Sequence, residues 1–201
     1  MLGRLKGLFT STAVDLNSLR APMSSWAMAY VVLVKSVNCT TTNSHLRIRH
    51  FPPSQNKGIL STTVGYTGGN PLVTNPSYKL VCGGATDHAE AVKIEFDPSI
   101  VTYDQLVEFF YRTHDPTTVN RQGADTGSQY RSAIFTHSDE QAAVAKRVTE
   151  EVQAKHFTPK GQKIVTEIVP AGPWWNAEDY HQLYLFKNPS GYQCPTHRLH
   201  W

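Results

Sequence analysis

Alternating apolar and polar residues mark the clearest strand of the chain. Val92, Ile94 and Phe96 alternate with Lys93 and Glu95, which is the period of a strand with one buried face. The breaker string Asp-Pro-Ser follows at 97–99. The pattern therefore predicts a strand over residues 91–96.

A helical pattern comes next. Thr102 is an N-cap residue type, and Gln105 stands three positions later, as in a capping box. The apolar stripe of this helix consists of Leu106, Phe109 and Phe110. The helix is expected to stop before Pro116, because the residue before a proline is driven out of the helical region.

The remaining pattern continues in the same way. We predict a strand over 132–136, a helix over 138–157 that begins at Ser138 with Gln141 in the capping-box position, and a strand over 163–170. Asn176 is expected to cap a last short helix that runs through Tyr184 and ends at the turn string 188–191. Strands interleaved with helices predict a mixed α/β or α+β domain whose helices cover the sheet.

The first 57 residues differ in character from the rest. Residues 1–57 contain seven Lys/Arg and one acid, whereas residues 58–201 contain twelve and fifteen. Residues 23–57 show no clear periodicity, so we assign no element there. We therefore divide the chain into a poorly defined basic segment, 1–57, and a domain, 58–201. The composition of 1–21 is compatible with a mitochondrial presequence or with a disordered cytosolic N-terminus.

Composition excludes several classes of protein. With 201 residues the chain fits one domain, or one domain plus a tail, and its longest apolar run, 27–34, is too short to span a membrane. A mildly acidic body argues against general nucleic-acid binding. The three cysteines form no CxxC pair, which argues against a zinc ribbon or a thioredoxin-type dithiol. Their odd number favours a reducing compartment, and no histidine grouping has the spacing of a metal site.

Polar and glycine residues gather in three loops, at 64–71, 82–90 and 114–132. Glu90, at the start of the predicted strand, is either a solvated surface carboxylate, which is the simpler interpretation, or an acid whose pKa is raised by apolar neighbours. Tyr66, Tyr78 and Tyr130 are phenols in predicted loops, where they either pack or donate to a polar oxygen.

The order of several motifs resembles the A-type peptide-methionine (S)-S-oxide reductases. The matching strings are VGYTGG at 64–69, PSYK at 76–79, HAE at 88–90, HDP at 114–116, NRQG at 120–123, DTGSQYRS at 125–132 and AEDYHQ at 177–182. Asp87 stands where the family has a glycine before HAE. The resemblance covers almost three quarters of the chain.

The resemblance implies an α+β fold: a two-layer sandwich of a mixed sheet with flanking helices, long loops and an irregular C-terminal tail. It also implies reduction of methionine (S)-sulfoxide, free or in proteins, by a cysteine thiolate. Glu90 matches the acid that protonates the sulfoxide oxygen, Tyr66 and Tyr130 the phenols that bind it, and Asp125 an orienting carboxylate. Thioredoxin is implied as the reductant, and no cofactor, nucleic acid or membrane partner is expected. We expect a monomer that is cytoplasmic or, alternatively, mitochondrial.

The nucleophile segment departs from the family. The string GCFWG is absent, and counting back from His50 places Cys39 at its cysteine, with threonines at 40 and 41 in place of the aromatic pair. Either Cys39 is the nucleophile in a degenerate loop, or residues 23–49 derive from a mispredicted exon or retained intron. Cys194, after the NPSGY turn, matches a resolving thiol, and Cys82 is expected to be a packed thiol. The alternative function is an inactive relative that only binds oxidised methionine.

Overall fold

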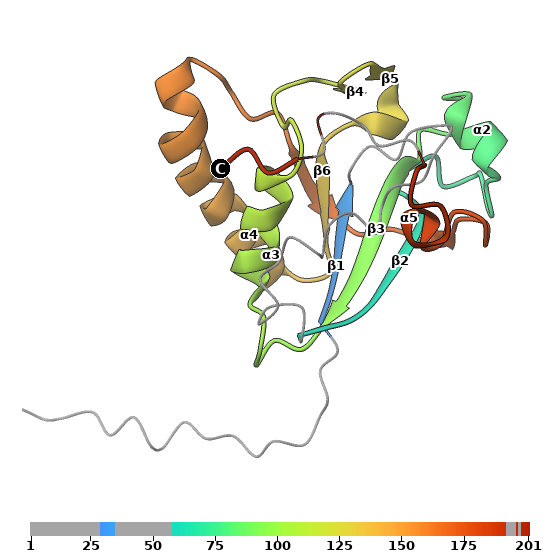
Figure 1. Cartoon of the computed structure of the whole chain (residues 1–201), viewed down its shortest axis with the longest axis horizontal. Helices are drawn as coiled ribbons and strands as arrows, with labels where there is room; N and C mark the ends of the chain where they lie inside the picture. Colours follow the sequence, from blue (N-terminus) through green and yellow to red (C-terminus); the bar gives the residue numbers. More distant parts are fainter. Residues whose placement is uncertain (1–28, 35–57, 192–195, 197) are drawn as a thin grey trace, which may run out of the picture.

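A mixed six-stranded sheet forms the centre of the computed structural model, which describes residues 29–34, 58–191, 196 and 198–201 (Figure 1). Its order is β7-β6-β1-β3-β2-β8. The bounds of these strands are Ala29–Val34 (β1), Ile59–Thr67 (β2), Ala89–Phe96 (β3), Ala133–Thr136 (β6), Glu167–Pro170 (β7) and Trp175–Asn176 (β8). Neighbouring strands are antiparallel except β6 and β7, which are parallel.

Helices and a small hairpin complete the described part of the chain. The helices are α2 (Tyr78–Cys82), α3 (Tyr103–Arg112), α4 (Asp139–Val152) and α5 (Tyr184–Lys187). A π-helical turn, Gln153–Phe157, and a 3-10 turn, Thr158–Lys160, continue from α4, and another 3-10 turn, η3, spans Ser128–Tyr130. Strands β4 (Arg121–Gln122) and β5 (Asp125–Thr126) pair as a separate hairpin. The expected α+β class is confirmed.

Capping side chains begin α3 and α4 where the sequence predicts. Thr102 Oγ1 accepts from the Gln105 amide at 3.4 Å, and the Gln105 side chain accepts from the Thr102 amide at 3.0 Å. Ser138 Oγ accepts from the Gln141 amide at 3.2 Å, but the Gln141 side chain accepts from the amide of residue 137 instead. The capping box of α3 is therefore complete, and that of α4 is half formed.

The core lies on both faces of the sheet. Figure 1 shows α3 and α4 side by side against one face, where Leu106 and Phe110 of α3 and Val148 of α4 pack with Val92 and Ile94 of β3. The opposite face carries a smaller cluster formed by Ala89, Ala91, Ala133 and Phe135, with Trp174 against it. The alternation of β3 thus separates two apolar layers, as the period of a strand requires.

One strand of the sheet comes from the N-terminal segment in which the sequence pattern predicted no element. β1 lies between β3 and β6, with Leu33 opposite Val92 and Ile134. The rest of residues 1–57 lies outside the described residues. Within the described residues, no helix is long and apolar enough to cross a membrane.

Two predicted elements differ from the structure. The strand expected over 163–170 covers only Glu167–Pro170, because the Ile164 amide donates to the Gln153 side chain and the Val165 amide to the Pro116 carbonyl. The helix expected from Asn176 through Tyr184 is wrong. Asn176 ends strand β8, turns follow, and only Tyr184–Lys187 is helical.

Candidate active site

Two of the predicted site residues face each other across neighbouring strands. Tyr66 of β2 is the register partner of Glu90 of β3. Directly opposite side chains in an antiparallel pair lie on the same face, with their Cβ atoms about 4.5–5.5 Å apart. The pairing of β2 with β3 therefore brings the expected acid and one expected phenol together.

Glu90 is buried in this arrangement. Only 1% of its surface is exposed, so the interpretation as a solvated surface carboxylate is wrong. The reason is tertiary: β3 is one of the two central strands of the sheet, and α2 places the sulfur of Cys82 3.6 Å from Glu90 Oε1. Cys82 is disulfide-bonded rather than a packed thiol.

The phenols of the site remain protonated donors. Burial raises the pKa of Tyr66, and its hydrogen bond to the Glu178 carboxylate raises this pKa further. Burial likewise raises the pKa of Tyr78, with further contributions from the neighbouring Glu90 and Tyr130. Tyr78 thus lies within electrostatic range of both Glu90 and Tyr130.

Tyr130 is positioned by the 3-10 turn η3. Its side chain is buried, and the neighbouring Gln129 side chain donates to the Cys82 carbonyl at 3.1 Å. This bond connects η3 with the end of α2. Asp125 lies five residues earlier, on β5 of the separate hairpin, outside the six-stranded sheet. Cys39 and Cys194 lie outside the described residues.

Arg131 holds the three predicted loops together. Its guanidinium donates to the carbonyls of Asp87 at 3.1 Å, Ser128 at 2.8 Å and Gly68 at 3.0 Å. Asp87 has a positive φ of 54°. This is the left-handed region that glycine adopts readily and that aspartate tolerates, so the aspartate fits where the resembling family has glycine.

A carboxylate that sequence reasoning gave no role is part of the same cluster. Glu178 accepts from the Tyr66 hydroxyl at 2.9 Å and from the Tyr78 amide at 2.9 Å. Gln182, four residues on, accepts from the Val64 amide and donates to the Val64 carbonyl. Both belong to the string 177–182, where the sequence predicted a helix, and their partners on β2 and α2 are at least 100 residues away in the sequence.

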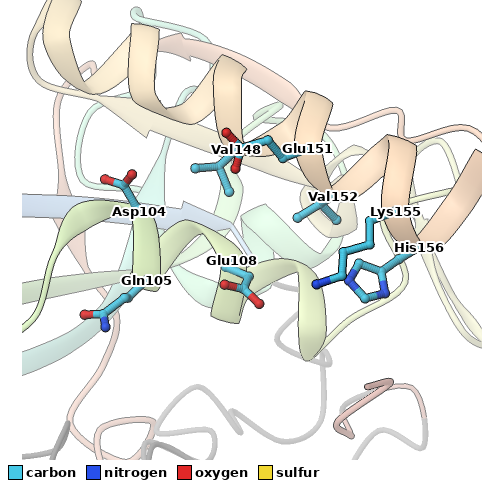
Figure 2. Close-up of a pocket in the computed structure, with 8 residues that line it drawn as sticks. All are labelled: Asp104, Gln105, Glu108, Val148, Glu151, Val152, Lys155 and His156. Carbon is cyan, nitrogen blue, oxygen red and sulfur yellow. The ribbon is translucent and has the colours of Figure 1, made fainter.

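A groove between α3 and α4 is separate from this cluster (Figure 2). It is lined by Asp104, Gln105, Glu108, Val148, Glu151, Val152, Lys155 and His156. None of the predicted site residues that the structure describes lines it. The candidate active site is therefore the cluster at β2, β3 and α2.

A buried carboxyl, protonated phenols and a disulfide-bonded sulfur lie close together in an α+β fold, a combination that indicates an oxidoreductase. Comparison with known proteins agrees with this class. The family described as "Peptide methionine sulfoxide reductase" matches residues 51–199. The chain belongs to this family, and its enzyme class is that of the peptide-methionine (S)-S-oxide reductases.

Individual relatives support the same assignment. The "Probable peptide methionine sulfoxide reductase" of Schizosaccharomyces pombe is 55% identical over 170 residues, which are 85% of this chain and 96% of the relative. The crystal structure of reduced Mxr1 from Saccharomyces cerevisiae has a TM-score of 0.76 and 40% identity, and the match covers 87% of this chain and 94% of Mxr1. The structure of Mxr1 in complex with Trx2 has a TM-score of 0.52 and 26% identity, over 90% and 96% of the two chains.

Proposed function

We propose that this chain reduces methionine (S)-sulfoxide, free or within proteins, to methionine by thiol chemistry. The observation that carries the proposal is the buried Glu90, directly across from Tyr66 and 3.6 Å from a sulfur atom. A carboxyl in such a place can give a proton to an oxygen that leaves sulfur, and phenols beside it can stabilise the charge that develops on that oxygen.

The proposed first step reduces the substrate and oxidises a cysteine. The Cys39 thiolate attacks the sulfoxide sulfur, and the S–O bond breaks as Glu90 protonates the oxygen. Tyr66 and Tyr130 donate to that oxygen, and Asp125 orients the site. The protonated oxygen leaves as water, and the Cys39 sulfur is then bonded to the substrate sulfur. A water molecule attacks the Cys39 sulfur, the S–S bond breaks with its electron pair going to the substrate sulfur, and methionine and the Cys39 sulfenic acid result. The substrate sulfur is thereby reduced and the cysteine sulfur oxidised.

The proposed second step restores the thiol. Cys194 attacks the sulfenic acid, which releases water and forms a disulfide. A dithiol reductant then reduces this disulfide, and thioredoxin is proposed because the relative Mxr1 was solved in complex with Trx2. Cys82 is a second candidate for the disulfide partner, because its sulfur lies next to Glu90 and is disulfide-bonded.

Turnover of methionine (S)-sulfoxide with dithiothreitol, and separately with thioredoxin, tests the proposal. We expect Cys39→Ser to abolish both activities. Cys194→Ser is expected to abolish turnover with thioredoxin and to spare one stoichiometric reduction. Cys82→Ser is the matched comparison, and a full loss there with retention in Cys39→Ser would transfer the nucleophile assignment to Cys82.

Glu90→Gln tests the acid. The substitution keeps size but removes the proton donor, and general acid catalysis contributes about 10²–10⁴-fold. We expect a loss of that order in kcat. Activity within about threefold of wild type would refute the assigned role.

Binding without reduction is the second candidate function. It is favoured by the threonines at 40 and 41, which replace the aromatic pair of the resembling family. This function predicts measurable binding of an oxidised methionine peptide by the intact chain with no methionine formed. Turnover by the chain as written excludes it.

A further inference from the structure

We propose that Glu178 is a positioning residue that holds the phenol of Tyr66 in its catalytic orientation. The inference rests on the proposed function, because it assigns a role in the same site. It depends on three groups from separate parts of the chain: Tyr66 on β2, Tyr78 at the start of α2, and Glu178 in the turn after β8.

The direction of the Tyr66 hydrogen bond follows from the protonation states. Burial would raise the pKa of Glu178, but hydrogen bonds from the Tyr78 amide and the Tyr66 phenol outweigh it and lower this pKa overall. The carboxylate is therefore ionised and can only accept. In this structure the Tyr66 hydroxyl therefore donates its single proton to Glu178 Oε2, at 2.9 Å.

The position of Glu178 is itself fixed on several sides. Its Oε1 accepts from the Tyr78 amide at 2.9 Å, and its Oε2 lies 3.7 Å from Nε2 of His181. The Ala177 amide donates to the Val64 carbonyl at 3.0 Å, which holds the turn against β2. A carboxylate held at both oxygens restricts the phenol far more than an exposed side chain could.

Geometry explains why such a restraint is needed. Tyr66 is 2% exposed and stands opposite Glu90, so a small rotation of its ring would move the hydroxyl away from the oxygen that Glu90 protonates. An incoming oxygen competes with Glu178 for the phenolic proton. The phenolic proton turns from Glu178 to that oxygen as the oxygen enters, so the carboxylate acts by setting the orientation of the Tyr66 ring beforehand.

A double-mutant cycle tests the proposal, because residues that act through one another are not additive. In wild-type background we expect Glu178→Ala to lower kcat about 10–100-fold, because the Tyr66 ring is then no longer held where its hydroxyl meets the substrate oxygen. KM is not expected to rise. In the Tyr66→Phe background the same substitution should change kcat by less than about threefold.

Conservative and control variants separate positioning from folding. Glu178→Gln keeps one acceptor oxygen and is expected to recover part of the lost kcat; it also replaces Glu178→Ala in the cycle if the alanine variant does not fold. Glu151→Ala removes an exposed carboxylate that pairs with Arg147 on α4, and we expect its kcat to equal that of wild type.

Three results would overturn the proposal: equal losses in both backgrounds, no loss in wild-type background, or a Tyr66→Phe variant as active as wild type. Failure of the proposed function has a different signature, since the unmodified chain would then show no turnover at all. An active wild-type chain with additive losses refutes the role of Glu178 alone.

Discussion

The side chain of Gln182 forms hydrogen bonds with β2 at the place where a further residue of β8 would pair with it. Strand β8 pairs with β2 only at Gly65 and Tyr66. At the next residue, Val64, the amide donates to Gln182 Oε1 at 3.1 Å, and Gln182 Nε2 donates to the Val64 carbonyl at 2.9 Å. A carboxamide thus imitates the peptide of a neighbouring strand, and its Nε2 also donates to the Ala177 carbonyl at 3.0 Å.

Gln182→Ala removes these three hydrogen bonds. Each contributes about 1 kcal/mol net, and the Val64 carbonyl keeps its bond from the Ala177 amide at 3.0 Å. We therefore expect the free energy of unfolding to fall by about 2–3 kcal/mol. For a chain of this length that corresponds to a decrease in Tm of about 5–10 °C.

Gln182→Glu is the sharper test, because it changes one group without changing the size of the side chain. The introduced carboxyl can still accept from the Val64 amide. When it is ionised, its second oxygen faces the carbonyl oxygens of Val64 and Ala177, which now receive no proton from it. Its pKa is expected to lie above the unfolded value of about 4.3. The native state then binds more protons, so the variant loses stability relative to wild type as the pH rises from about 4 to 7.

The free energy of unfolding of both variants is measured by urea unfolding, followed by tryptophan fluorescence. The two conditions are about pH 4.5 and about pH 7, because a carboxyl with a raised pKa titrates between them. Gln162→Ala is the control, because that side chain is exposed and its loss should change stability by no more than about 0.5 kcal/mol. The reasoning is refuted if Gln182→Ala behaves like this control, or if the cost of Gln182→Glu is the same at both pH values.

Three further predictions concern the surroundings of the site. A Cβ at Gly65 would overlap the Trp175 carbonyl oxygen, whereas one at Gly172 meets nothing within 4 Å. Thermal unfolding should therefore give Gly65→Ala a Tm several degrees below that of Gly172→Ala, and equal Tm values would contradict this. Burial lowers the pKa of His88, so the neutral imidazole stabilises the fold and this contribution is lost as the pH falls below about 6.5. In His88→Gln the free energy of unfolding should therefore fall less between about pH 7 and about pH 5 than in wild type. The same dependence on pH in both proteins would contradict this prediction. Arg131→Lys keeps the charge but loses the planar guanidinium that donates to three carbonyls. Urea unfolding should show a free energy of unfolding that is about 1–3 kcal/mol lower. A variant as stable as wild type would show that these hydrogen bonds do not stabilise the fold.

Local patterns predicted several elements correctly because short-range interactions determine them. Strand β3 follows from the alternation of Val92, Ile94 and Phe96, and α3 follows from the capping pair Thr102 and Gln105. The turn 177–182 was misjudged for the same reason. Its polar residues have helical spacing, but their partners are on β2 and α2, about one hundred residues or more away, and no local pattern contains that information.

The candidate site was only partly open to prediction. The motifs singled out Glu90, Tyr66, Tyr130 and Asp125 by resemblance, whereas from the residues alone Glu90 was more simply an exposed carboxylate. Its 1% exposure depends on the strands on either side of it and on α2 across its end. Glu178 could have been proposed from its place in a family motif, but its bond to Tyr66 could not.

The sequence by itself determined which segments form strands and helices over most of residues 89–157, and which family motifs the chain carries. Both are properties of neighbouring residues, since capping, alternation and motif order need no distant partner. Only the tertiary structure decided that Ala29–Val34 enters the centre of the sheet, that Glu90 is buried opposite Tyr66, and that Glu178 accepts the hydrogen bond of the Tyr66 phenol. Strand register and hydrogen bonds between remote segments arise when the whole sheet assembles, because only then do these groups share one buried space.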